Sequence, residues 1–353
     1  MIYTITAFAF LLLSLFVWNK KKEGNRLLLF AIIWLIILEG FRWNIGTDWE
    51  PYFDFFMGED NSHMGVAYLW LNKIVRSFSS SYTSMTLLIA ILTYATMYGL
   101  FRKFSPAPIM SILIYYCSML GLLGSNRQFI AVIISVCSLY FVFHRKLFLF
   151  ILSLAIAASF HFTALVFIPV YFIYGKVVPS KVIVLIILAS FFISISHIVN
   201  RIPFVESVAM LDIITDGTRN FSSNIDSYVG TVSIIGSLKR LLFVFVAIML
   251  RKKINNAYYD FFLYLYCIGT IIYLLFNGSV IQLMAGRGAL YYSLYETLVI
   301  PYIVLNINLL RVQQKAVWIS LFALYLFLMW RDINSYYLLD GVDIFNPYRS
   351  ILL

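Results

Sequence analysis

Twelve apolar runs constrain the fold of this chain more than any other feature of its sequence. A bilayer offers no water to backbone N–H and C=O groups, so long apolar segments are typical of membrane-spanning helices. The composition agrees, because 62% of the residues are hydrophobic and 12% are charged, against about 25% charged in an average soluble domain. We therefore predict an all-α polytopic membrane protein with about 12 transmembrane helices in a single transmembrane domain, residues 1–353. The runs lie near residues 2–18, 26–40, 84–101, 108–123, 127–143, 147–160, 162–174, 182–199, 233–250, 257–277, 288–309 and 316–330.

Six basic clusters predict how the chain crosses the membrane. Each cluster falls between an odd-numbered apolar run and the next even-numbered run, so the positive-inside rule places all six in the cytoplasm and both termini outside. Two extracytoplasmic loops then stand out, residues 39–83 and residues 200–232. Apolar residues at helical spacing over 64–77 predict an interfacial helix within the first loop. Because the net charge of +10 is scattered between runs, nucleic acid is not an expected partner.

The stretch Gly40–Tyr52, GFRWNIGTDWEPY, is unusually polar for the end of an apolar run. Ionisable residues such as Arg42 and Asp48 at a bilayer edge commonly indicate a ligand site. The alternative is an interfacial belt, in which the aromatic side chains anchor at the level of the lipid headgroups. Asp48 is the neatest candidate for a base, although the spacing does not raise it above Glu50 or Asp54.

Three further positions combine basic residues with predicted outward-facing helix starts. Arg127 stands in GSNRQ and Arg287 in AGRG, each where an inward-running helix begins, while Lys239 and Arg240 lie about two turns into a third such helix. Free N–H groups at a helix N-terminus bind anions, and a guanidinium adds two parallel hydrogen bonds to a phosphate. This arrangement predicts a pyrophosphate held without a metal. The alternative is that each arginine extends only to lipid headgroups.

Two other ionisable residues interrupt apolar sequence. His161 lies between two short runs, where it could orient a phosphate or act as a base near neutral pH. A buried, hydrogen-bonded structural histidine is the alternative. Glu296 lies near the middle of the run at 288–309 and shares a helical face with Tyr292, so a structural network competes with a catalytic role.

No metal or other cofactor is expected. The three cysteines lack ligand spacing, and the histidines do not pair at any such spacing. Acidic residues that could hold a hard cation occur together only near Asp48. The four histidines are His63, His144, His161 and His197.

Four short blocks in order resemble one family. Arg42 with IGTDWEPY, NRQFIA from Asn126, ASFHFTAL around His161 and GRGALYY from Arg287 are similar to the EpsG-type exopolysaccharide membrane proteins. These are related in role to the Wzy polymerases of O-antigen and capsule synthesis. The ending FNPYRS is also similar. Trp49 replaces the first tyrosine of the usual GTDYxxY pattern, and Tyr52 keeps the second.

The resemblance implies a metal-independent glycosyltransferase of GT-C-like architecture in the inner (cytoplasmic) membrane. It would transfer a growing glycan from undecaprenyl pyrophosphate to a lipid-linked oligosaccharide repeat at the outer face. Its partners would be these lipid-linked substrates, membrane lipid and a chain-length-regulating co-polymerase. The catalytic candidates are Asp48, His161 and Glu296; the pyrophosphate-binding candidates are Arg42, Arg127, Lys239, Arg240 and Arg287; the substrate-binding candidates are Tyr52, Asn126, Gln128 and Tyr291.

Other functions remain open at this point. A flippase or transporter of lipid-linked oligosaccharide would need polar residues on both leaflets, and no internal repeat of the kind common in transporters is visible. A membrane acyltransferase would need a cytoplasmic donor site. An O-antigen ligase, which transfers a finished glycan to another lipid, is chemically close to a polymerase.

Overall fold

The computed structural model describes residues 1–58, 64–196, 198–201, 234–277, 279, 282–335 and 343–352. Across these ranges the chain is helical and forms no strand, apart from one isolated antiparallel bridge between Arg42 and Ser350. The predicted loop at 200–232 lies outside the described residues except for its first two, as do His63 and His197.

Four described helices are long and apolar enough to cross a membrane. A fifth candidate consists of α15 (Gln282–Ser293) and α16 (Glu296–Asn306), which are bent by 51° at a short break. The structure therefore confirms a helical protein with several membrane-spanning candidates, whereas the count of about twelve spans stays a prediction. The four helices are α5 (Tyr82–Phe104), α7 (Asn126–Phe143), α14 (Ala257–Phe276) and α17 (Arg311–Ile333).

The other helices are shorter or carry more charge. Each of the twelve apolar runs nevertheless coincides with a helix or with two consecutive helices. The remaining elements are α1 (Ile2–Phe16), α2 (Lys21–Gly40), α3 (Trp49–Met57), α4 (Val66–Phe78), α6 (Pro108–Met119), η1 (Leu120–Leu122), α8 (Leu147–Phe160), η2 (Phe162–Phe167), α9 (Val170–Ile173), α10 (Ser180–Ile195), η3 (Ile198–Arg201) and α13 (Ile234–Ile254).

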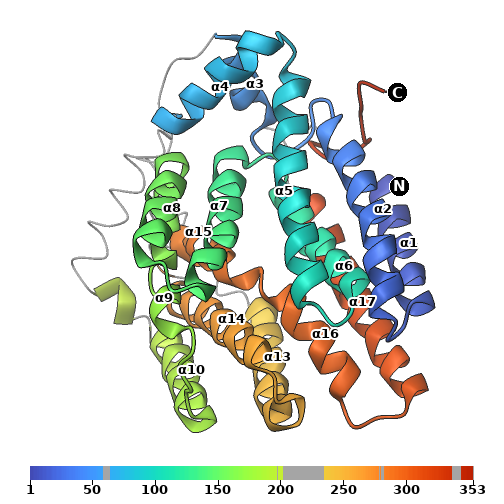
Figure 1. Cartoon of the computed structure of the whole chain (residues 1–353), viewed down its shortest axis with the longest axis vertical. Helices are drawn as coiled ribbons and strands as arrows, with labels where there is room; N and C mark the ends of the chain where they lie inside the picture. Colours follow the sequence, from blue (N-terminus) through green and yellow to red (C-terminus); the bar gives the residue numbers. More distant parts are fainter. Residues whose placement is uncertain are drawn as a thin grey trace. The chain divides into compact units, whose positions relative to one another are not determined.

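The chain divides into two compact units. Unit 1 comprises Met1–Asn61, Ala67–Cys137 and Ile300–Leu353, and within it α2 packs along α5 and α6, while α6 also packs on α1 and α17 (Figure 1). Unit 2 comprises Ser62–Val66 and Ser138–Val299, and within it α14 packs on α10, α13 and α15.

The basic turns of unit 1 gather at one end of its helices. Lys21 Nζ donates a hydrogen bond to the carbonyl of Lys103 (3.3 Å), and Arg311 Nη2 donates to the carbonyl of Trp18 (3.3 Å). The stretch Gly40–Tyr52 lies at the other end, since α2 runs the whole way between the two. This separation of charge supports the predicted topology, but the orientation of the chain in a membrane stays a prediction.

The amphipathic segment expected at 64–77 is helix α4. One side of the helix is buried through Tyr68 and Val75, while Trp70, Ile74 and Phe78 are exposed. The exposed apolar side chains fit an interfacial position, which also stays a prediction.

Candidate functional site

Two loops of unit 1 meet at the polar end of α2. The backbone N–H of Thr47 donates to the carbonyl of Leu123 (2.8 Å), so the polar stretch lies directly against the turn before α7. Gly46 (φ +115°) and Gly124 (φ +112°) face each other across this contact. A Cβ on Gly46 would lie 2.5 Å from the Leu123 oxygen, so only glycine allows this approach.

The C-terminal tail, residues 343–352, holds the same loop from the other side. The N–H of Trp43 donates to the carbonyl of Arg349 (3.0 Å), and the N–H of Gly46 donates to that of Ile344 (3.3 Å). The Tyr348 hydroxyl donates to the carbonyl of Leu38 at the end of α2 (2.8 Å). These contacts join segments about 300 residues apart in the chain, and the sequence did not predict them.

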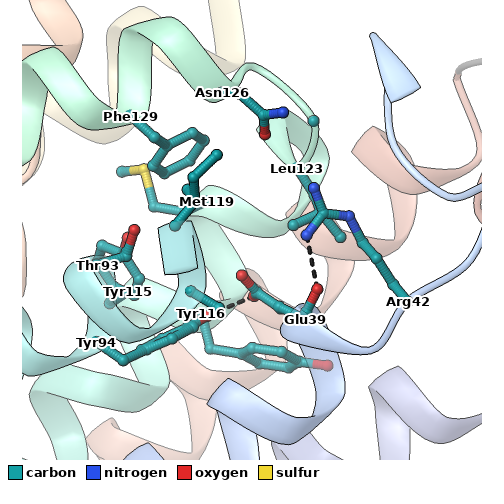
Figure 2. A pocket seen from close by; sticks show the side chains of 13 residues that line it. Glu39, Arg42, Thr93, Tyr94, Tyr115, Tyr116, Met119, Leu123, Asn126 and Phe129 are labelled. Atoms are coloured by element: carbon teal, nitrogen blue, oxygen red, sulfur yellow. Dashed lines mark hydrogen bonds between the residues drawn. The ribbon is translucent and has the colours of Figure 1, made fainter. Parts of the chain in front are cut away.

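Arg42 is the best buried charge of this loop, with 4% of its surface exposed. Its Nη1 donates to the carbonyl of Glu39 (2.6 Å) and its Nε donates to that of Ile45 (3.2 Å), as Figure 2 shows for the first contact. Backbone carbonyls therefore fix the guanidinium, and no carboxylate in the described part of the chain forms an ion pair with it. The Glu39 carboxylate lines the same pocket and attracts this charge without a direct ion pair.

The Arg42 pocket is a small, partly open cavity of unit 1, with a volume of about 20 Å³ for the centres of water-sized molecules. Its walls come from the end of α2, from α5 and α6, and from the start of α7 (Figure 2). Among the described residues that line it, Glu39 is the only acidic and Arg42 the only basic one. The other lining residues are Ile89, Ala90, Thr93, Tyr94, Tyr115, Tyr116, Met119, Leu123, Gly124, Asn126 and Phe129.

Two polar residues of the pocket are fixed by tyrosines. The Tyr94 hydroxyl donates to Glu39 Oε1 (Figure 2), and Asn126 Nδ2 donates to the hydroxyls of Tyr82 (3.0 Å) and Tyr68 (3.4 Å). Sequence reasoning included Asn126 but missed Glu39. An ionisable residue at the end of an apolar run, three positions before Arg42, was the signal that could have found it.

Asp48 and Arg127 lie beside this pocket without lining it. Asp48 occupies the N-cap position of α3, and its Oδ2 accepts a hydrogen bond from the Ser125 hydroxyl (3.5 Å). Arg127 lies in the first turn of α7, as predicted, and its Nε donates to the Tyr52 hydroxyl (3.3 Å). Burial raises the pKa of Tyr52, while the positive charge of Arg127 opposes that rise, so Tyr52 stays protonated at neutral pH. Gln128, the next residue of α7, is buried.

His161 belongs to unit 2, where it forms a short polar chain. The residue follows the end of α8 and is 8% exposed. Its Nδ1 lies 2.6 Å from Thr163 Oγ1, and the Thr163 hydroxyl donates to the Tyr291 hydroxyl (3.3 Å). The structure thus brings together two of the predicted residues, His161 and Tyr291.

Glu296 and Lys239 bind each other in unit 2. Lys239 Nζ lies 2.8 Å from Glu296 Oε1, and the Tyr266 hydroxyl donates to Glu296 Oε2 (2.9 Å). The expected shared face with Tyr292 is wrong, because the helix breaks between α15 and α16 and Tyr292 instead donates to the carbonyl of Val166 (2.6 Å). A structural network around Glu296 accounts for its burial.

The other two basic candidates of unit 2 lie within helices. Arg240 stacks over the Tyr273 ring at 3.7 Å from its centre. Arg287 was predicted at a helix start, but α15 begins at Gln282, which places Arg287 in the second turn. The prediction was wrong because the five residues before Arg287, Gln282–Gly286, are already helical. Free N–H groups of the helix start therefore do not adjoin its guanidinium.

Several membrane-spanning candidates indicate an integral membrane protein, and unit 1 holds a small pocket with polar residues at the end of α2. The EpsG family model matches residues 25–350, and the chain belongs to this family. No curated protein and no solved structure matches the chain. Membership confirms the resemblance seen in the four blocks and indicates a polysaccharide polymerase type of role with lipid-linked substrates in a membrane.

Proposed function

We propose that this protein polymerises a polysaccharide at the outer face of the cytoplasmic membrane. It transfers a growing glycan from undecaprenyl pyrophosphate to a lipid-linked oligosaccharide repeat. Both units belong to one transmembrane domain of GT-C-like architecture with about twelve spans and both termini outside. The observation that carries the proposal is Arg42, a buried cation held by backbone carbonyls in a pocket, in a chain that matches the EpsG family over residues 25–350.

Arginines stabilise the leaving pyrophosphate in this proposal. As the glycosidic carbon separates from the phosphate oxygen, negative charge develops, and fixed cations in a site that excludes water stabilise it. Arg42 and Arg127 supply this charge in unit 1, with the N-terminal N–H groups of α7 next to Arg127. Arg240 and Arg287, both in unit 2, remain proposed phosphate-binding residues on the basis of the sequence. Lys239 contributes least, since Glu296 already neutralises it.

The acceptor sugar needs a partner for its hydroxyl proton. Asp48 and His161 are the two proposed acceptors from the sequence, and Glu296 is the weakest of the three because Lys239 and Tyr266 already contact its oxygens. If Asp48→Asn polymerises normally and His161→Ala is inactive yet stably inserted, the role moves to His161. The residues proposed to bind the sugars through hydrogen bonds or stacking are Tyr52, Asn126, Gln128 and Tyr291.

Polymerisation in a purified system tests the proposal. The protein in liposomes with lipid-linked repeats should yield a ladder of polymer lengths, and the ladder should disappear for Arg42→Ala. An added chain-length-regulating co-polymerase should narrow the range of lengths. A flippase would move the repeats between leaflets without lengthening them, and a ligase would transfer them only to a different lipid. Either result with the wild-type protein refutes the proposal.

A further inference from the structure

We infer that Glu39 is a catalytic residue of this protein, the carboxylate that receives the proton of the acceptor hydroxyl. The inference rests on the proposed polymerase function and assigns a group that the four sequence blocks do not contain. Glu39 is the only acidic residue among those described that line the Arg42 pocket. A base must lie within hydrogen-bond reach of the proton it takes, so position in the pocket is the first requirement.

The side chain of Glu39 is fixed in a single orientation. The Tyr94 hydroxyl donates to Oε1, and the Arg42 guanidinium donates to the backbone carbonyl of Glu39 itself (2.6 Å). Figure 2 shows the Glu39 carboxylate between the side chains of Tyr94 and Arg42. A base that is oriented by a third group is the usual arrangement at sites that activate a nucleophile.

Packing does not explain a glutamate at this position. An ionisable group at the end of a membrane helix is costly, and a glutamine could accept the same hydrogen bond from Tyr94. The one cation recorded as acting on this carboxylate among the described residues is the Arg42 guanidinium of the same pocket, and the two form no direct ion pair of the kind that joins Glu296 to Lys239. The hydrogen bond with Tyr94 uses Oε1, so the hydrogen bond alone does not require the second carboxylate oxygen or its charge.

Asp48 and His161 fit this position less well. Asp48 is absent from the pocket lining, occupies the N-cap position of α3, and receives a hydrogen bond from Ser125. His161 has its Nδ1 in contact with Thr163 within unit 2. Glu39 alone among the described acidic residues shares a cavity with Arg42, the group proposed to hold the pyrophosphate.

The step balances as a single displacement. The acceptor hydroxyl oxygen forms a bond to the anomeric carbon of the donor glycan, and the bond from that carbon to the pyrophosphate oxygen breaks. The electron pair of the broken bond stays on the pyrophosphate, beside Arg42. The hydroxyl proton passes to the Glu39 carboxylate and afterwards to water, so the anomeric configuration inverts and no covalent glycosyl-enzyme forms.

Two variants with a matched control test the assignment. Glu39→Gln keeps the shape and the hydrogen bond with Tyr94, so kcat should fall by about 10²–10⁴-fold while the KM for the lipid-linked acceptor stays unchanged. Tyr94→Phe removes only the positioning hydroxyl, and it should lower kcat less and also leave KM unchanged. Glu23→Gln, which changes an exposed glutamate paired with Lys20, should polymerise as the wild type does.

Chemical rescue separates proton transfer from structure. Glu39→Ala leaves space for a small carboxylate, so added formate should restore part of its turnover, whereas Glu39→Gln should not respond. The inference is overturned if Glu39→Gln polymerises at the wild-type rate, if it loses acceptor binding, if formate restores nothing, or if mass spectrometry finds a glycan attached to Glu39. If the wild-type protein itself makes no polymer, the proposed function is refuted, and the assignment of Glu39, which depends on it, is refuted as well.

Discussion

A methyl group added at Gly46 should break the contact on which the Arg42 loop depends. The added Cβ would lie 2.5 Å from the Leu123 oxygen and 2.9 Å from the Leu123 carbonyl carbon, and backbone atoms cannot rotate away as a side chain does. The backbone at Gly46 (φ +115°) is also unfavourable for any residue with a side chain. Strain of this kind costs about 1–3 kcal/mol and overpacking adds about 1–3 kcal/mol, so Gly46→Ala should lose roughly 2–6 kcal/mol.

Gly99→Ala is the matched control for Gly46→Ala. Gly99 lies in α5 of the same unit, and a Cβ there meets nothing within 4 Å, so the variant should be neutral or slightly stabilised. Unfolding of the purified proteins by SDS, followed by tryptophan fluorescence, measures both free energies of unfolding. Equal stability and equal polymer synthesis in the two variants would show that the close approach of the two loops does not matter.

Four further outcomes follow from the same structure. Arg127→Ala should abolish polymer at unchanged protein level, and Lys should rescue poorly because it cannot form two parallel hydrogen bonds to a phosphate. Polymerisation should persist in excess EDTA, and recovery of a lost activity by Mg²⁺ or Mn²⁺ would contradict this. Burial opposes ionisation of Asp343, but hydrogen bonds from the side chain and backbone of the adjoining turn lower its pKa. The ionised carboxylate therefore stabilises the tail fully above about pH 4, and this stabilisation is lost as the pH falls below the lowered pKa. Limited proteolysis of the tail should therefore rise in acid, and less steeply in Asp343→Asn. Cys137 is exposed and is replaced by Ser in both topology variants. Leu352→Cys should then react with a membrane-impermeant thiol reagent in intact cells, and Val177→Cys should not. Reaction of Val177→Cys alone would show that the chain has the opposite orientation in the membrane.

The helices could be predicted from the sequence because a helix buried in a bilayer needs a continuous run of apolar residues. Each apolar run coincides with helical structure, and the segment at 64–77 is a helix close to its expected bounds. The breaks inside runs were not predictable. The run at 288–309 carries no proline or glycine at Leu294–Tyr295, yet α15 and α16 bend there by 51°, which moved Glu296 away from Tyr292 and gave it Lys239 as a partner.

The candidate site was predicted in part. Polar residues are costly at the ends of apolar runs, and this cost singled out Arg42, Asp48, Asn126 and Arg127 in the sequence. The structure places Arg42 and Asn126 in the lining of the pocket and leaves Asp48 and Arg127 outside the lining. Glu39 was missed because it stands at the last turn of α2, where a charge can be taken as the first residue of a loop. Only its contact with Tyr94, a residue 55 positions later, shows that it faces the pocket instead.

The C-terminal tail explains why the missing part could not be found from the sequence. It is joined to the Arg42 loop partly through backbone groups alone, as in the bonds from Trp43 to Arg349 and from Ile351 to Phe41 (3.1 Å), and partly through the side chains of Arg349 and Ser350. Every residue except proline carries the same backbone donor and acceptor, so such pairing leaves no residue pattern at either partner. What the sequence does retain is the set of side chains that fix the two ends of the pairing, Tyr348 on Leu38 and Tyr3 on Phe345. The ending FNPYRS therefore supports the candidate site, because the backbone that it supplies holds the Arg42 loop, and with it the buried guanidinium, at the pocket.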